Sequence, residues 1–211
     1  MTEIKKMTIH RALTELKTLD SRIAKATNEA VVVLANRKAN DKINGITLEE
    51  YKKAMQASHD KVVSLINYRN RLKSAIVQSN AITEVTVAGE KMTVAQAIER
   101  KDSIQHDETY LYNLQRQYRE AINKVAREND SLPAKLETYL VNILGSKDKQ
   151  LEEEVKLHTD TFMKRNEFEL VDPINVVKLI EELETRINEF KSEVDAILSE
   201  SNATTFIEIE A

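Results

Sequence analysis

Cysteine and tryptophan are absent from the 211-residue chain, which also has only three Gly and two Pro. Without cysteine the protein has no disulfide, no thiol nucleophile and no cysteinyl metal site, which fits a reducing cytoplasm or a virion assembled there. The scarcity of Gly and Pro favours long helices over a many-stranded sheet. Aromatic residues make up only 5%, so we expect a thin, aliphatic core.

Long apolar runs and a surplus of positive charge are missing as well. No stretch of about 18 apolar residues is present, so the sequence predicts no membrane-spanning helix. The N-terminus has lysines but lacks the apolar core of a signal peptide. The chain has 31 Lys and Arg against 35 Asp and Glu, a net charge of −4, and the two signs are interleaved. Because nucleic-acid binding requires a concentrated basic face, we expect none.

Apolar residues recur at intervals of three and four along most of the chain, as in amphipathic helices. A first helix is predicted to begin at Thr8. A second helix follows Thr47 with a 3.5-residue period over four heptads, as in a coiled coil. A third runs from about 94 to 129, and a last helix opens at Asp172-Pro173. We therefore predict a mainly α fold of long antiparallel helical hairpins or a coiled-coil bundle, in one elongated domain spanning 1–211.

Two segments depart from this pattern. Residues 29–46 contain a β-branched run and then a polar stretch with an Asn44-Gly45 turn signal, and we interpret them as a helix end or short strand followed by a loop. Residues 132–168 form an excursion from the main hairpins. In it, Pro133 opens a fourth helix that ends at Gly145, and a charged helix follows at about 148–165.

Three helical positions have predicted structural roles. Thr47 and Thr93 each precede a Glu or Gln by three residues, the capping-box pattern in which two side chains bind two otherwise unpaired amides. Arg69 occupies a position in the apolar seam of the second helix. Since a polar residue in such a seam usually sets the register or the partner, we predict that role for Arg69.

The second helix and the last helix end in the same string, Ser-Asn-Ala-x-Thr, which begins at Ser79 and at Ser201. Asn tolerates the left-handed conformation often found at a helix end, and its short side chain can bond nearby backbone. We therefore predict Asn80 and Asn202 as helix caps. The alternative is a coincidence, because helix ends often contain Ser and Asn.

Each of these strings leads into alternating polar and apolar residues, which predicts strands near 83–87 and 205–209. Two short strands that leave neighbouring helix ends can supply each other's missing backbone partners. We therefore expect them to pair in a small β-sheet at one end of the helical bundle.

The chain up to residue 102 follows a recognisable order: the heptad seam of the second helix, Ser-Asn-Ala-Ile-Thr at 79–83, a turn at Gly89, and Met-Thr-Val-Ala-Gln-Ala-Ile-Glu-Arg-Lys-Asp at 92–102. With Val171-Asp172-Pro173 before the last helix, this order resembles the septicolysin-like family of small helical proteins. The resemblance covers about 8–26, 60–125 and 170–205. The family takes its name from a pore-forming toxin, and the resemblance implies no defined catalysis.

Four shorter strings point to a biological setting: Asn-Gly at 44–45, Glu-Arg-Lys-Asp at 99–102, Glu-Leu-Val-Asp-Pro at 169–173 and Ser-Asn-Ala at 201–203, before the final strand. They are similar to strings in proteins of tailed phages and prophages of Gram-positive bacteria. This resemblance implies a phage protein, located in the host cytoplasm or the virion, more strongly than any particular role.

No group of residues has the spacing of a catalytic, cofactor or metal motif. None of the four histidines has a second histidine four residues later, and the three glycines are isolated in turns instead of forming a phosphate loop. Acidic runs at 152–154 and 181–184 are typical of solvated helix faces. Tyr118 lies in the seam of the third helix, where packing is favoured over stacking on bases. We therefore expect no enzyme, no cofactor and no metal ion.

The function these expectations favour is a non-enzymatic, phage-encoded structural or assembly protein, associated with the virion and acting through helical self-association. Long hairpins expose more apolar surface than one thin chain buries, so we expect a homo-oligomer. One alternative is a small accessory protein that binds and inhibits a host protein. Another is a membrane-active, pore-forming protein, although the apolar segments 30–34 and 139–144 are too short to span a bilayer. Expected partners are further copies and other phage or host proteins, with no nucleic acid and no membrane.

Overall fold

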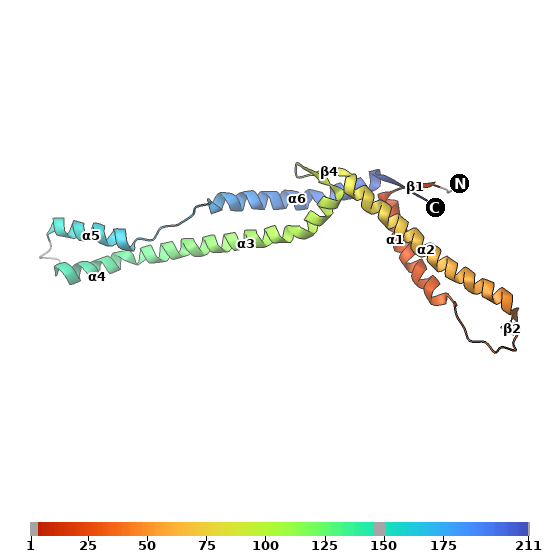
Figure 1. The fold of residues 1–211 in the computed structure, drawn as a ribbon. Coiled ribbons are helices and arrows are strands. Elements are labelled where there is room, and N and C mark those ends of the chain that lie inside the picture. Colours follow the sequence, from red (N-terminus) through yellow and green to blue (C-terminus); the bar gives the residue numbers. More distant parts are fainter. Residues whose placement is uncertain (1–3, 146–150, 211) are drawn as a thin grey trace. The chain divides into compact units, whose positions relative to one another are not determined.

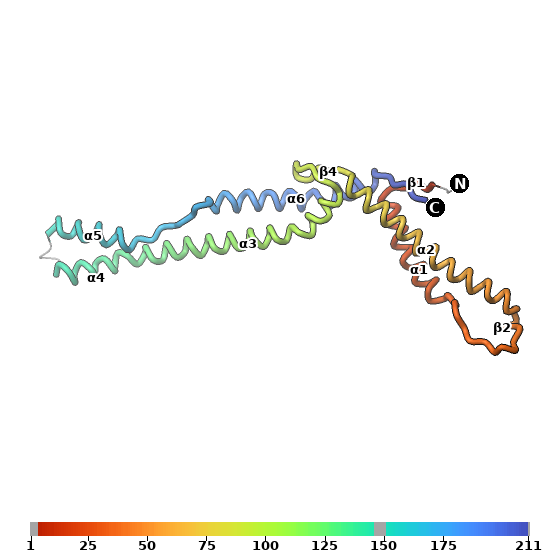
Figure 2. The backbone as a smooth tube through the Cα atoms, in the orientation of Figure 1, coloured from red at the N-terminus to blue at the C-terminus, as the bar shows by residue number. Residues whose placement is uncertain are grey.

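The structure is a computed structural model that describes residues 4–145 and 151–210, most of which are helical (Figures 1 and 2). The mainly α fold with small antiparallel sheets that the sequence predicts is confirmed. The chain divides into two compact units, one formed by residues up to 102 together with those from 189 onward, the other by residues 103–188. The elements in chain order are β1 (Ile4–Thr8), α1 (Ile9–Glu29), β2 (Lys42–Ile43), β3 (Ile46–Thr47), α2 (Leu48–Ile82), β4 (Glu84–Val87), β5 (Glu90–Thr93), α3 (Val94–Asp130), α4 (Leu132–Leu144), α5 (Glu152–Asn166), α6 (Val176–Thr204) and β6 (Phe206–Glu210).

Both predicted strands exist as β4 and β6, but the prediction that they pair with each other is wrong. β4 pairs with β5 and β6 pairs with β1, in two separate antiparallel sheets. β4 pairs with β5 because the two strands are neighbours in the chain, separated only by Ala88 and Gly89. These residues have φ of 50° and 75°, the positive values that a two-residue hairpin turn requires. β6 pairs instead with the N-terminal strand β1, for which the sequence has no strand pattern.

The first unit has its core where β1 and β6 pack on α1 and α2. Alternate residues of β6 point inward, so that Ile207 and Ile209 are buried while Phe206 and Glu208 are exposed. In α1 the buried positions are spaced by three and four, as the predicted amphipathic pattern requires. The buried residues of this cluster are Met7, Ile9, Ala12, Leu16, Leu19, Leu72, Ile76, Ile207 and Ile209.

The two strand pairs are built from matching residues, and the chain contains two copies of one strand–helix–helix–strand arrangement. The first strand of each copy ends in Lys-Met-Thr, at Lys6–Thr8 and at Lys91–Thr93. Each of these threonines precedes a helix, and its hydroxyl oxygen accepts a hydrogen bond of 3.2 Å from the amide three residues later. The last strand of each copy pairs with the first strand of the other.

The Ser-Asn-Ala-x-Thr strings make the same backbone contacts in both copies. The amide of each threonine donates 2.9 Å to the carbonyl of the serine four residues earlier. The carbonyl of each threonine then accepts a hydrogen bond, of 2.8 or 2.9 Å, from the first amide of the first helix in the other copy. The donor–acceptor pairs are Thr83–Ser79 and Thr205–Ser201, then Val94–Thr83 and Ile9–Thr205. The repeated string therefore marks an equivalent joint in the fold.

The predicted capping role of Asn80 and Asn202 is wrong. Both residues lie inside their helices, which continue to Ile82 and Thr204. Among the described residues neither has a positive φ. The reason is that the chain leaves α2 in an extended conformation, with φ −74° and ψ 121° at Thr83, so this helix end needs no left-handed residue.

The region predicted as a helix end and loop at 29–46 has that form: α1 ends at Glu29, an extended stretch follows, and β2 and β3 flank the Asn44-Gly45 turn. The short ladder β2–β3 then delivers the chain to Thr47 and α2. The β-branched run from Val31 to Val33 is therefore extended without being part of a sheet.

The second unit contains the excursion predicted at 132–168. In it α4 packs on α5, with the rings of Tyr139 and Phe162 5.0 Å apart between their centroids. The charged helix predicted at 148–165 is α5, and the predicted positions 148–150 lie outside the described residues. The last helix begins at Val176 instead of at Asp172-Pro173, because the Asp172 carboxylate acts as a cap that accepts from the Val176 amide at 2.8 Å.

Candidate interaction surfaces

The predicted capping residues hold helix starts and do not converge on a common site. The Thr47 hydroxyl oxygen accepts from the Glu50 amide at 3.3 Å, and the Glu50 carboxylate accepts from the Thr47 amide at 3.3 Å. Thr93 and Gln96 form the same reciprocal pair, at 3.2 Å and 2.8 Å. Both capping boxes inferred from the sequence are thus present as hydrogen bonds, and their role is structural.

Arg69 of α2 lies against α1, where its guanidinium Nε donates to the carboxylate of Asp20. Both side chains are more than one third exposed to solvent. The pair joins the two helices of the hairpin at one register, which is compatible with the predicted role of Arg69. Asp20 could not be identified as its partner from the sequence, since the two residues are 49 positions apart.

A polar cluster that sequence reasoning missed joins β1, α1 and α2. The Lys5 ammonium donates to both carboxylate oxygens of Glu15, at 2.8 and 2.9 Å, and lies 3.1 Å from the Tyr68 hydroxyl oxygen. The Tyr68 hydroxyl in turn donates to Glu15 at 2.8 Å. Nothing in the spacing of residues 5, 15 and 68 indicates that they meet.

The electrostatics of this cluster favour the ion pair. Hydrogen bonding to Glu15 raises the pKa of Lys5. Burial raises the pKa of Glu15, but hydrogen bonds from Lys5 and Tyr68 together lower it by more, so that the carboxyl pKa lies below its usual value. Burial raises the pKa of the Tyr68 hydroxyl. All three groups therefore stay in their ordinary charge states near neutral pH, which suits a structural link between strand and helices.

The equivalent positions of the second copy are Glu90, Arg100 and Phe190, where the strand carries the acid and the helix carries the base. The Arg100 guanidinium lies 5.9 Å from the centroid of the Phe190 ring, as the Lys5 ammonium lies 5.7 Å from that of Tyr68. In both copies the strand position and the helix position carry opposite charges. The strand residue is basic in the first copy (Lys5) and acidic in the second (Glu90).

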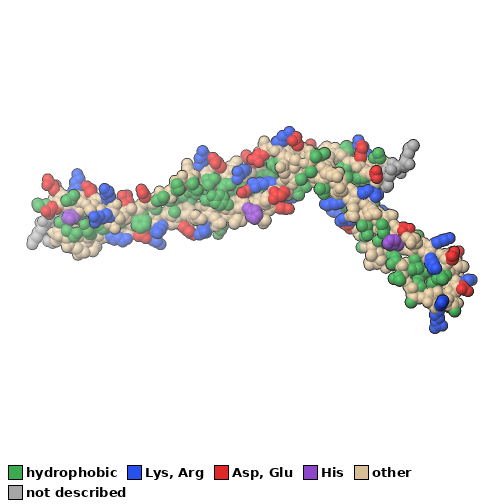
Figure 3. All heavy atoms as spheres, in the orientation of Figure 1, with side chains coloured by type: hydrophobic (Ala, Val, Ile, Leu, Met, Phe, Trp, Pro, Cys, Tyr) green, Lys and Arg blue, Asp and Glu red, His purple; other side chains and the backbone are tan. Residues whose placement is uncertain are grey.

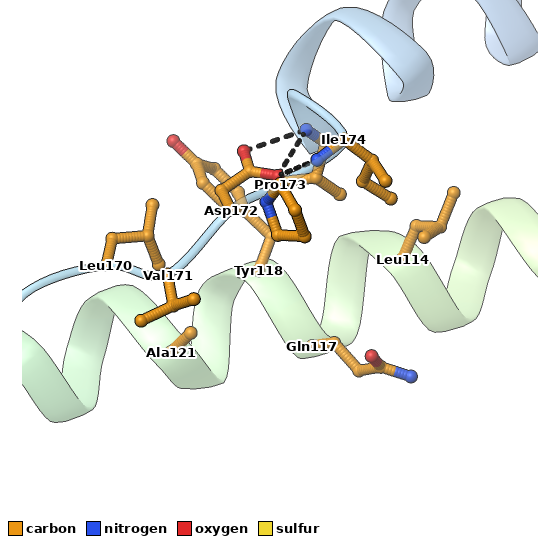
Figure 4. Close-up of a pocket in the computed structure, with 10 residues that line it drawn as sticks. Leu114, Gln117, Tyr118, Ala121, Leu170, Val171, Asp172, Pro173 and Ile174 are labelled. Carbon is orange, nitrogen blue, oxygen red and sulfur yellow. Dashed lines mark hydrogen bonds between the residues drawn. The ribbon is translucent and has the colours of Figure 1, made fainter.

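An apolar groove lies in the second unit, between α3 and the segment that leads into α6 (Figure 4). Its volume is about 250 Å³. Tyr118 and Ala121 form its α3 side, and Val171 and Pro173 lie over them (Figure 4). The full lining is Leu114, Gln117, Tyr118, Ala121, Leu170, Val171, Asp172, Pro173, Ile174 and Val176.

Asn129 fixes this segment on α3 through its side-chain amide. Its Nδ2 donates to the Phe168 carbonyl and its Oδ1 accepts from the Phe168 amide, both at 2.9 Å. The Lys124 ammonium lies 5.8 Å from the centroid of the Phe168 ring. The segment is therefore held in place while two of the side chains that line the groove stay exposed, Val171 at 82% and Ile174 at 56%.

A second exposed surface lies at the turn between α1 and α2 in the first unit. Here the extended residues after Ala30 cover a hollow of about 340 Å³ formed by Val32 with the α2 residues Lys52, Met55, Gln56 and His59. Val31 and Val33 remain exposed, at 45% and 81%. Figure 3 shows apolar side chains both on this turn and around the start of α6.

Comparisons with protein-family models, with curated proteins and with solved structures find no match to this chain. In the part that the structure describes, no helix is long and apolar enough to cross a membrane. Across residues 4–145 and 151–210, no three His, Asp or Glu side chains are grouped as metal ligands. Among the described residues, the candidate contact surfaces are exposed apolar helix faces and two extended segments.

Proposed function

We propose that the protein is a non-enzymatic structural or assembly protein that works by self-association of its helical surfaces. The observation that carries this proposal is the amount of surface the chain leaves uncovered. Its accessible surface is 15370 Å² at 24.1 kDa. Two separate compact units of about half this mass each would together expose about 12,000 Å². A hairpin two helices thick buries only one side of each helix. We infer that further copies of the whole chain cover the exposed sides.

Apolar residues on the exposed helix faces support the same proposal. Each such residue alone is ordinary, but contiguous apolar surface in excess of a few hundred Å² usually marks an interaction site. On α2 and α3, several large apolar side chains remain exposed. They include Val63, Ile66, Val77 and Ile82 on α2, and Ile98, Tyr110, Tyr112 and Ile122 on α3.

The phage setting in this proposal is supported by the resemblance of the strings at 44–45, 99–102, 169–173 and 201–203 to those of tailed-phage proteins. In that setting the protein is associated with the virion. Mass spectrometry of particles purified from a host that carries the gene tests this part. Peptides of the chain at a constant ratio to the major particle proteins are expected, and their absence from the particles contradicts virion association.

Self-association is tested by co-expressing two copies of the full chain with different affinity tags. Capture through one tag is expected to recover the other copy at a ratio that is stable to washing. As a control, the two tagged copies are expressed separately and mixed only after lysis in high salt. Failure to recover the second copy under both conditions contradicts the proposal.

A further inference from the structure

Two extended segments of the chain expose apolar side chains and carry opposite charge. Residues 30–37 follow α1, and residues 167–174 connect α5 to α6. Residues 30–37 and 167–172 run as stretched chain, and a turn at 173–174 follows the second stretch (Figures 1 and 2). Between Glu29 and Asp41 the sequence has Arg37 and Lys38 and no acid. Between Asn166 and Lys178 it has three acids and no base: Glu167, Glu169 and Asp172.

The extended part of the 167–174 segment, before the turn at Pro173 and Ile174, presents a backbone edge at Glu169. In an extended chain the amide and carbonyl of one residue point to the side opposite those of the next residue. Because Asn129 binds both backbone groups of Phe168, those of Glu169 point away from α3. Among the described residues, no hydrogen bond joins the backbone amide or carbonyl of Glu169 to another backbone group. The segment therefore resembles an edge strand, which can accept a further strand.

The 30–37 segment has the complementary features of an added strand. Residues Val31 to Ala35 form no backbone–backbone hydrogen bond in the part of the chain that the structure describes. Three of these residues are valines, which favour extended structure. Alternation places Val31 and Val33 on one face, and both are exposed. After Asn36, Arg37 and Lys38 follow this apolar stretch.

We propose that the 30–37 segment of one copy docks along the 167–174 segment of a second copy, by strand addition. Val31 and Val33 then cover the apolar surface formed by Val171 and Ile174, and Arg37 and Lys38 lie near Glu167 and Glu169. Strand addition gives affinity through the backbone, and the side chains give specificity. Each copy has one surface of each kind, so the contact is heterologous and continues into a ring or a filament. This inference rests on the proposed self-association and identifies the surfaces that mediate it.

A charge exchange in the full-length protein tests this docking. One variant carries Arg37→Glu and Lys38→Glu, and the other carries Glu167→Lys and Glu169→Lys. Each variant alone brings like charges together, and we expect its association at low ionic strength to weaken by about tenfold or more. In an equimolar mixture both contacts again join opposite charges. The mixture is therefore expected to return to within about threefold of the unmodified protein.

Matched controls separate this effect from a change in net charge. Lys17→Glu with Lys73→Glu, and Glu181→Lys with Glu184→Lys, reverse the same number of exposed charges at positions outside both segments. These controls are expected to associate like the unmodified protein. Circular dichroism of all variants checks that their helical content is unchanged.

Two results would overturn the docking while leaving the proposed function intact: association unaffected by either segment variant, or weakened association that the mixture does not restore. If the unmodified protein itself does not associate, the proposed function fails before the docking is tested. Restoration in the mixture, together with unaffected controls, supports the docking between copies of this chain.

Discussion

Replacement of Ile207 by Ala is the most informative perturbation of the fold, because this residue closes the core of the first unit from the last strand of the chain. Ile207 is 5% exposed and lies opposite Met7 in the β1–β6 pair. It belongs to the cluster that also holds α1 and α2 residues. Truncation of a buried isoleucine costs about 2–5 kcal/mol, as lost transfer energy plus a cavity. Since a two-stranded sheet relaxes more easily than a closed core, we expect about 2–3 kcal/mol here.

Phe206 provides the control on the same strand. Its side chain is larger than that of isoleucine but is 57% exposed, and the Lys6 ammonium lies 5.7 Å from its ring centroid. Replacement of Phe206 by Ala is expected to cost below about 1 kcal/mol, as for most exposed positions. The ranking is opposite to that expected from side-chain size alone.

The free energy of unfolding of both variants can be measured by urea titration followed by circular dichroism at low protein concentration. The expected result is a lower midpoint for Ile207→Ala with little change for Phe206→Ala, at equal slopes. If Phe206→Ala lost as much stability as Ile207→Ala, the inward and outward faces of β6 would be assigned incorrectly. The β1–β6 closure would then not form the core described above.

Three further predictions concern the polar contacts. Thr47→Ala and Thr93→Ala are each expected to lower the free energy of unfolding by about 1 kcal/mol through loss of an N-cap, and urea titration at neutral pH checks this against Thr18→Ala as the control. The pKa of Glu15 is lower in the folded state than in the unfolded state. Its contribution to stability is therefore present above the unfolded pKa of about 4.3 and is lost as pH falls through the folded pKa. Glu15→Gln should lose less stability than the unmodified protein between neutral and acidic pH, and equal losses would refute the ion pair. A double-mutant cycle on Arg69→Ala and Asp20→Ala should give a coupling of about 0.2–1 kcal/mol that decreases with salt, as for exposed pairs, and zero coupling at low salt would remove the predicted register role.

Features determined by neighbouring residues were predictable from the sequence, and features that depend on distant pairing were not. The capping boxes at Thr47 and Thr93 involve residues only three positions apart, so the local sequence pattern was sufficient to predict them. β1 was missed because its partner is β6, with Met7 opposite Ile207, and an isolated five-residue segment has little strand signal. The repeat of Lys-Met-Thr at 6–8 and 91–93 was the one clue to this strand.

The assignment of Asn80 and Asn202 as caps failed for a related reason. Side-chain preference favoured a left-handed helix end at each asparagine, whereas the threonine that follows leaves each helix toward a sheet. The two extended segments were also only partly predictable. The sequence indicated that 29–46 leaves the helical pattern, but the anchoring of Phe168 by Asn129 spans 39 residues and has no local signal.

The central claim is that the exposed helical surface is covered by further copies of the chain, and the molar mass in solution tests it most directly. Light scattering coupled to size-exclusion chromatography is measured on the full chain over a range of micromolar concentrations at low and moderate salt. A mass well above the 24.1 kDa of one chain, increasing with concentration, is the expected result. A constant mass of one chain at every concentration contradicts the proposed function.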